Sequence, residues 1–468
     1  ELAAGIRAGR WSSREVVDAH IAEVERVNPD LNAVVYPRFA EARQEAEAAD
    51  ARRALAGPDD LPPLHGVPCT IKECFALTGM PQTAGLVSRT AHRAPEDATA
   101  VGRYRAAGAI PMGVTNTSEL CMWMESSNEV YGRTNNPYDL TRMVGGSSGG
   151  EGAIIGAGAS PFGLGSDVGG SIRMPAYFNG VFGHKPTGGL IPGSGQFPNA
   201  KGDALRYLTT GPLCRKADDL WPLVKILAGP DGIDSGCRDW PLGDPAAVSL
   251  RDLPVTVVPG RGAQRTAANV TDAIARAASA LGDQGASIRA HDLPRLNHSL
   301  EIWASMLGET QGHGDFRTTM GRPQIWELGV QLLWWVLGLS PHTLPAIGLG
   351  LLEDVGKWTP KRTARMVAEG VALRAELIAL IGDGVLLYPS YPTVAPKHHH
   401  PLFPPINYAH VCVFNVMELP VTQVPLGLSD EGLPLGVQVI GAPGQDHVTV
   451  AVAQALERGM GGWVPPGR

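Results

Sequence analysis

Two glycine-rich turns, each carrying a serine, lie close together in this 468-residue chain. The first turn is Gly145-Gly146-Ser147-Ser148-Gly149-Gly150, and the second is Asp167-Val168-Gly169-Gly170-Ser171. Glycine tolerates positive φ and lacks a Cβ, so these runs can aim successive backbone N–H groups at one point. Converging N–H groups stabilise an oxyanion, and the candidate donors here are those of Val168, Gly169, Gly170 and Ser171.

A lysine follows a short apolar segment upstream of both turns. The run Val67-Pro68-Cys69-Thr70-Ile71 predicts a buried strand that ends at Lys72. Burial favours the uncharged form of a lysine, and an uncharged amine can act as a base. Lys72, Ser147 and Ser171 are therefore the candidate catalytic residues.

Taken together, these segments resemble the amidase signature family of Ser-cisSer-Lys hydrolases. The spacing of the three candidate residues along the chain is also similar to that of the family. Glu151 and the segment 174–186 look most like the fatty-acid amide hydrolase branch. The similarity extends over residues 11–457, almost the whole chain.

The resemblance implies a mechanism for cleaving amides. Ser171 would attack the carbonyl carbon and become acylated, Ser147 would relay a proton, and Lys72 would act first as a base and then as an acid. Water would then release the acid, and no cofactor is needed. The resemblance also implies a cis peptide bond before Ser147.

The segments around the turns predict an α/β fold. A strand over 67–72, a helix over 98–107 and a strand over 110–114 make one β-helix-β unit, which favours parallel pairing. We expect a single large amidase-signature domain, 1–468, with a twisted, mixed and mostly parallel sheet covered by helices on both faces. Its expected parts are N-terminal helices (1–60), a signature core (61–212), a peripheral helical or cap layer (213–383) and a return to the core sheet (384–468).

Composition argues against several classes of function. The 46 acidic and 39 basic residues give a net charge of −7. The charges are mixed along the chain and form no basic stripe, which argues against binding to nucleic acid. Six cysteines without a CxxC pair argue against a disulfide framework or a zinc site and favour a reducing compartment. No hydrophobic leader is visible, so we expect a cytoplasmic protein, with membrane association left open.

The first turn also fits a different catalytic motif. Gly145-Gly146-Ser147-Ser148-Gly149 satisfies G-x-S-x-G, which would make Ser147 the nucleophile of a hydrolase with a downstream Asp and His. That motif is short, and it leaves Lys72 and Ser171 unexplained. A non-catalytic interaction module on the same fold is a further alternative, although all three candidate residues are present.

Two sets of polar residues have both a functional and a structural explanation. Asp167 and Arg173 flank the second turn and could brace it as a hydrogen-bonded pair, or could face solvent. His398-His399-His400 could bind a metal, but consecutive imidazoles point in different directions and prolines bracket the tract. An exposed loop is the favoured interpretation of the histidines, and no metal is assigned.

The most apolar segment is Leu328 to Leu352, which Pro341 and Pro345 interrupt. These breaks predict two short helices rather than a transmembrane span. The two helices could cap the site and admit an acyl chain, lie on a membrane surface, or fill the core.

Apolar residues near the turns suggest a class of substrate. Met122, Met124 and Met174 offer an apolar lining beside the nucleophile, although methionines at such spacing also occur in cores. The resemblance to the fatty-acid amide hydrolase branch implies a small-molecule N-acyl amide with an apolar acyl part as the substrate, with esters as an extension, and an apolar lining would suit it. A small-molecule or aryl amidase, or the A subunit of the tRNA-dependent amidotransferase with its partner subunits and tRNA, is the alternative. A homodimer is left open.

Overall fold

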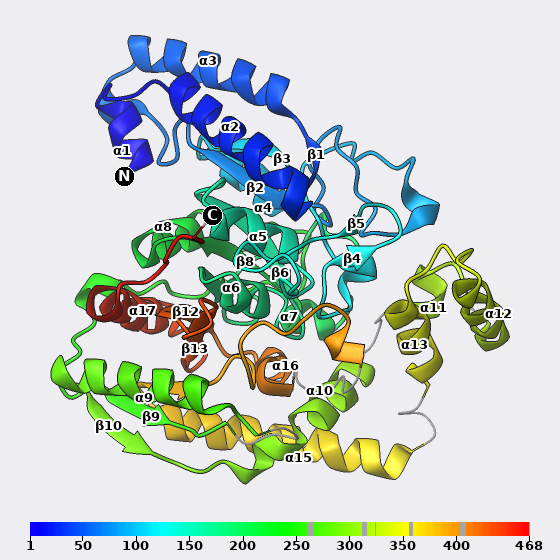
Figure 1. The fold of residues 1–468 in the computed structure, drawn as a ribbon. Coiled ribbons are helices and arrows are strands. Elements are labelled where there is room, and N and C mark those ends of the chain that lie inside the picture. The colour runs from blue at the N-terminus through cyan, green and yellow to red at the C-terminus, as the bar shows by residue number, and fades with distance from the viewer. Residues whose placement is uncertain (261–264, 311–315, 323, 355–358, 403–408, 468) are drawn as a thin grey trace.

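The computed structural model describes residues 1–260, 265–310, 316–322, 324–354, 359–402 and 409–467 (Figure 1). Among these residues, eleven strands form one large sheet in the order β1-β3-β2-β6-β8-β7-β12-β13-β11-β9-β10. They are β1 (Val34–Pro37), β2 (Pro68–Lys72), β3 (Ile110–Thr115), β6 (Phe162–Asp167), β7 (Phe182–Lys185), β8 (Thr209–Cys214), β9 (Pro254–Val257), β10 (Ser287–Ala290), β11 (Val385–Tyr388), β12 (Val421–Leu428) and β13 (Pro434–Ile440). A small separate ribbon pairs β4 (Ser127–Asn128) with β5 (Gly132–Arg133).

The sheet is mixed, as expected. Parallel pairing joins β2 to β3 and β6, and again β9 to β10 and β11. The expected β-helix-β unit is present, because α4 (Thr99–Ala106) connects the parallel strands β2 and β3. The expectation of mostly parallel pairing holds only within these two groups, since the strands between them pair antiparallel. One reason is that a short turn joins β12 to β13, and a hairpin makes its two strands antiparallel.

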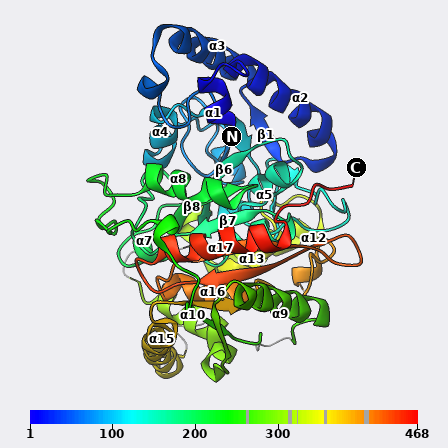
Figure 2. The ribbon, with the colours of Figure 1, turned by 90° about the vertical axis from the view of Figure 1, so that its left-hand side faces the viewer.

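Alternating side chains give the sheet two covered faces. Leu387 of β11 packs with one hydrophobic cluster and its neighbour Leu386 with another, as the two-residue period of a strand requires. The first cluster includes residues of α4, α8 (Ala217–Leu227), α9 (Ala268–Asp283) and α17 (Asp446–Met460). Helices α8, α9 and α17 lie on the side of the sheet that faces the viewer in Figure 2.

The opposite face is covered by a second group of helices. Two further clusters hold it, one near each end of the sheet. The helices that contribute to them are α2 (Ser13–Leu31), α3 (Phe39–Leu55), α5 (Gly149–Gly156), α6 (Arg173–Phe178), α10 (Ser299–Gly308), α15 (Pro360–Ile381) and α16 (Ala409–Val416). The expected covering of both faces by helices is therefore confirmed.

The middle of the chain contributes strands to the main sheet as well as helices that cover it. Strands β9 and β10 come from residues 213–383, which we expected to form a peripheral layer, and they extend the main sheet to its edge. Val255 of β9 packs in the same hydrophobic cluster as α9, so this strand shares the main core, whereas the residues of β10 are exposed. The helices that stand apart on the right of Figure 1 are α11 (Phe316–Thr319), α12 (Ile325–Val336) and α13 (Leu344–Leu352).

Two neighbouring strands position the candidate site. β2 and β6 pair in parallel, so Lys72 and Asp167, the last residue of each, lie at the same edge of the sheet. The first serine turn leads into α5, and the second lies between β6 and α6. Both turns therefore meet at the carboxyl ends of parallel strands, where α/β proteins commonly bind ligands.

Candidate active site

Lys72 points into the interior at the end of β2, and its side chain is completely buried. Its amine lies 2.7 Å from Ser147 Oγ and 3.0 Å from Ser166 Oγ. An amine within hydrogen-bond distance of a serine hydroxyl is placed to exchange a proton with it. Ser166 lies on the adjacent strand β6, and no motif in the sequence had marked it, because a single serine within a strand carries no local signal.

The first serine turn is tightly packed around Ser147, which is also completely buried. The peptide bond between Gly146 and Ser147 is cis, as the family resemblance implied. A Cβ at Gly146 would lie only 2.3 Å from the carbonyl oxygen of Trp123, so only glycine fits there without movement of the backbone. The Ser126 hydroxyl is within hydrogen-bond distance of the carbonyl of Ser147, at 3.1 Å, and holds the turn from the opposite side.

The second serine turn lies directly against the first. The backbone N–H of Ser148 donates to the carbonyl of Ser171 at 3.1 Å, which links the two turns. Ser171 is 7% exposed, whereas Lys72 and Ser147 are fully buried. Within the described residues, we find no direct hydrogen bond between the hydroxyls of Ser147 and Ser171. The three candidate residues thus lie in one place, and Ser171 is the one that reaches solvent.

A buried ion pair between Asp167 and Arg173 stabilises the second turn. Arg173 and Asp167 are both fully buried, and the closest contact between the guanidinium and the carboxylate is 2.9 Å. Burial alone would raise the pKa of Asp167. The charge and hydrogen bonds of Arg173, together with the N–H of Ile172 and the charge of Lys185, outweigh burial and hold that pKa well below its usual range. The same carboxylate accepts the N–H groups of Gly170 at 2.7 Å and of Ile172 at 3.0 Å.

This arrangement changes the set of candidate oxyanion donors. The N–H of Gly170 is already bound to Asp167, so it is not free to receive a developing oxyanion. The N–H groups of Val168, Gly169 and Ser171 have no hydrogen-bond partner within the described residues. These three amides are the remaining candidates.

Glu151 on α5 lies next to β2, the strand that ends at Lys72, and is completely buried. The hydroxyls of Thr70 and Thr115 each lie 2.7 Å from one of its carboxyl oxygens. Burial raises the pKa of Glu151 to about 8, and a neutral acid is therefore favoured near pH 7. Glu151 thus bridges β2 and β3 through Thr70 and Thr115. In the sequence, only the family resemblance had singled this residue out.

Two of the three methionines proposed as a substrate lining are packed inside the protein. Met124 and Met174 are at most 4% exposed and belong to a buried cluster with Tyr177 and Phe178. They support the backbone behind the first turn, and their packing favours a structural role. Met122 is only partly buried, so it is the one that still fits the proposed lining.

The histidine tract differs from the expected exposed loop at one position. His398 is mostly buried and bonds to Glu125, whereas His399 and His400 are exposed. Within the described ranges, no group of three or more His, Cys, Asp or Glu side chains is arranged to hold a metal ion.

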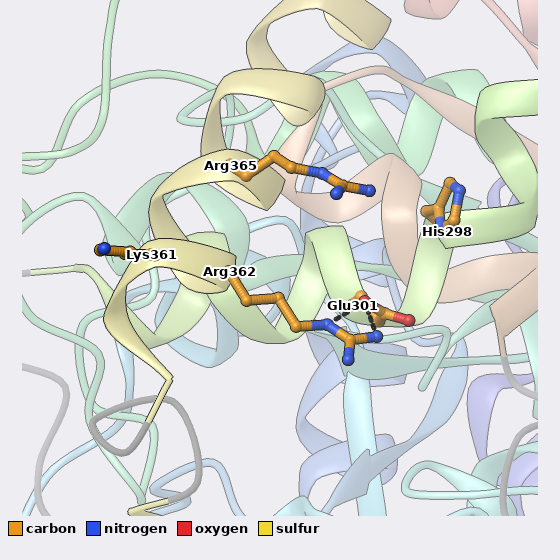
Figure 3. Close-up of a pocket in the computed structure, with 5 residues that line it drawn as sticks. All are labelled: His298, Glu301, Lys361, Arg362 and Arg365. Carbon is orange, nitrogen blue, oxygen red and sulfur yellow. Dashed lines mark hydrogen bonds and ion pairs between the residues drawn. The ribbon is translucent and has the colours of Figure 1, made fainter.

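A separate surface cavity of about 570 Å³ lies between α10 and α15 (Figure 3). It is lined by His298, Glu301, Lys361, Arg362 and Arg365. Glu301 and Arg362 form an ion pair of 2.8 Å. None of the residues that line it is a serine or cysteine nucleophile, so the acyl chemistry is assigned to the serine turns instead.

Comparison with known proteins identifies the family of this chain. A family model described as Amidase matches residues 15–450. The chain is 45% identical to fatty-acid amide hydrolase 2 of Homo sapiens, over all of this chain and 90% of that protein. It is 32% identical to the A subunit of glutamyl-tRNA(Gln) amidotransferase from Roseiflexus castenholzii, over 96% of this chain and 93% of that one.

A solved structure shows the same fold. The substrate complex of 6-aminohexanoate cyclic dimer hydrolase matches with a TM-score of 0.82 at 27% identity, covering 100% of this chain and 98% of the other. Sequence and structure thus agree over nearly the full length, and the resemblance noted at the serine turns extends to the whole domain. The chain belongs to the amidase signature family and is a hydrolase of carbon–nitrogen amide bonds.

Proposed function

We propose that this chain hydrolyses N-acyl amides with an apolar acyl part through an acyl-enzyme on Ser171. One observation carries the catalytic part of the proposal: the buried amine of Lys72 lies 2.7 Å from Ser147 Oγ, beside the Ser171 turn. The relationship to fatty-acid amide hydrolase 2 supports an apolar acyl group. Small-molecule amides or aryl amides are the competing substrates.

Each proton in the proposed reaction has a donor and an acceptor. The oxygen of Ser171 bonds to the carbonyl carbon while Ser147 takes its proton and passes its own to the neutral amine of Lys72. The tetrahedral oxyanion faces the free amides of the second turn. When the carbon–nitrogen bond breaks, the ammonium of Lys72 returns the proton through Ser147 to the leaving amine. Water then repeats the attack on the acyl-enzyme and releases the acid and Ser171.

The length of the acyl chain provides the test of the substrate class. We expect kcat/KM to rise by about tenfold for every two methylenes from a two-carbon to a ten-carbon acyl p-nitroanilide, because each buried methylene contributes about 0.8 kcal/mol. The p-nitroaniline released is measured by its absorbance. Equal turnover of short and long acyl groups would assign a small-molecule or aryl amidase instead.

Helices α12 and α13 form an apolar hairpin whose outer surface is exposed. The apolar face of α12 and its C-cap consists of Trp326, Val330, Leu333, Trp334, Val336 and Leu337, which are between 37% and 70% exposed. Contiguous exposed apolar surface of this kind marks a contact with a membrane, a ligand or another protein. Among the described residues, no helix is both long enough and apolar enough to cross a bilayer.

The base of this hairpin is fixed to the catalytic core. The buried carboxylate of Glu119, a few residues beyond β3, accepts the N–H of Thr343 at 2.8 Å and lies 2.7 Å from His342 Nδ1. The inner residue Leu328 packs with Ile347, which leaves the apolar face of α12 pointing outward. We infer that this face rests on a lipid surface, from which an apolar amide could be supplied to the site.

Vesicle binding tests this inference. We expect the native chain to sediment with phosphatidylcholine vesicles, and a double variant Leu333→Gln, Trp334→Gln to sediment at least tenfold less, because burial of these two side chains drives the association. A matched control is Leu55→Gln, which alters another highly exposed leucine, on α3. No sedimentation, or a dimer in light scattering that the double variant abolishes, would assign the face to another role.

A further inference from the structure

Trp303 on α10 reaches the turn that carries Ser171. Its indole N–H donates to the carbonyl oxygen of Val168 at 2.7 Å. The side chain is only 8% exposed and packs in the cluster that holds α10, α15 and α16 together. The bond spans 135 residues of sequence, so it joins the middle region of the chain to the catalytic turn.

The geometry of a peptide bond gives this contact a consequence. The carbonyl of Val168 and the N–H of Gly169 belong to the same planar peptide, which is trans, so the two groups point in opposite directions. A donor that fixes the carbonyl on one side therefore fixes the direction of the N–H on the other side. Gly169 N–H is one of the three amides left free to bind an oxyanion.

Packing leaves the turn little freedom to rotate. A Cβ at Gly169 would lie 3.3 Å from the indole of Trp303 and 3.7 Å from Cys412, so both side chains lie close to the glycine. At Gly170, whose φ is +108°, a Cβ would lie 2.3 Å from Val411. The carboxylate of Asp167 holds the N–H of Gly170 at the other end of the turn. Within the part of the chain that the structure describes, the indole N–H makes the one hydrogen bond that holds the plane of the peptide between Val168 and Gly169.

We propose that Trp303 is a positioning residue that aims the N–H of Gly169 at the oxyanion formed during attack by Ser171. This inference rests on the proposed function, because it assigns a role within the same site. Trp303 does not touch the reacting atoms; it acts through the Val168 peptide. The contribution of such a residue appears in the transition state and in adducts that carry an oxyanion, and hardly at all in the binding of the ground-state amide.

The test replaces Trp303 by phenylalanine, which keeps an aromatic ring and removes the donor. We expect kcat for the ten-carbon acyl p-nitroanilide to fall by about 10- to 100-fold, with KM changed by less than about threefold. The affinity for a trifluoromethyl ketone with the same acyl chain, which forms an oxyanion adduct with serine, should fall by the same factor as kcat/KM. The affinity for the corresponding alcohol, which forms no adduct, should not change.

A matched control is Trp221→Phe, since Trp221 is a similarly buried tryptophan on α8, on the other face of the sheet. It should leave both kcat and ketone affinity near the native values. Native kcat in Trp303→Phe, or equal losses of ketone and alcohol affinity, would overturn the positioning role. A native protein that neither hydrolyses the anilide nor reacts with a fluorophosphonate would instead overturn the proposed function itself.

Discussion

Replacing Ser171 by alanine is expected to lower amide hydrolysis by at least about 10⁴-fold and to abolish covalent labelling by a fluorophosphonate. The substitution removes the oxygen proposed to attack the carbonyl and little else. The carbonyl of Ser171 would still accept the N–H of Ser148, and the ion pair of Asp167 with Arg173 would still hold the turn. The melting temperature should therefore stay close to that of the native chain.

The labelled peptide decides between the two serine turns. Mass spectrometry of the native protein should place the phosphonate on Ser171, because of the two candidate catalytic serines Ser171 is the one that reaches solvent. A label on Ser147 would instead support the G-x-S-x-G interpretation, in which Ser147 is the nucleophile. Ser148→Ala is the matched control, because Ser148 is a buried serine of the first turn and should leave labelling intact. A native protein that binds the probe nowhere would support a non-catalytic module.

Replacing Lys72 by methionine is expected to lower kcat by about 10²- to 10⁴-fold, the range of a general base. Methionine has a similar length and no amine, so the cavity stays filled while Ser147 and Ser166 lose their shared partner. Proton transfer from Ser171 would then end at Ser147. Both hydrolysis of the ten-carbon anilide and the rate of fluorophosphonate labelling should slow together.

A second buried lysine provides the control for this variant. Lys185 on β7 is also completely buried, and its amine donates to the carbonyl of Pro186 at 2.8 Å. Lys185→Met therefore removes an equally buried amine outside the proposed proton path, and we expect kcat within about threefold of native. If Lys72→Met retained native kcat, or if both variants lost the same activity with the same loss of stability, Lys72 would not be the base.

Local sequence patterns were sufficient to find the elements around the site. The strand ending at Lys72, the helix over 98–107 and the strand over 110–114 were all recovered in the structure as β2, α4 and β3. Periodicity and helix-ending glycines mark such elements because they act between residues close in the chain. The same patterns predicted a peripheral layer over residues 213–383, whereas β9 and β10 extend the main sheet; short edge strands such as β10 carry only a weak signal.

Residue type alone could not decide whether a side chain lines the site or supports it. Met124 and Met174 are the same residue type as Met122, yet they lie in a buried aromatic cluster. Only the path of the neighbouring chain determines which methionine meets solvent. Of the three methionines, Met122 is therefore the one that the structure leaves partly exposed.

The amino-acid sequence by itself determined the family, the three candidate catalytic residues and the two turns that carry the serines, because short glycine-rich motifs need specific residues at fixed local positions. Tertiary structure alone decided which backbone amides remain free. Asp167 takes the N–H of Gly170, and Trp303 fixes the carbonyl of Val168 from an element 135 residues away. Such contacts depend on how strands and helices pack in space, and no local pattern along the chain encodes them.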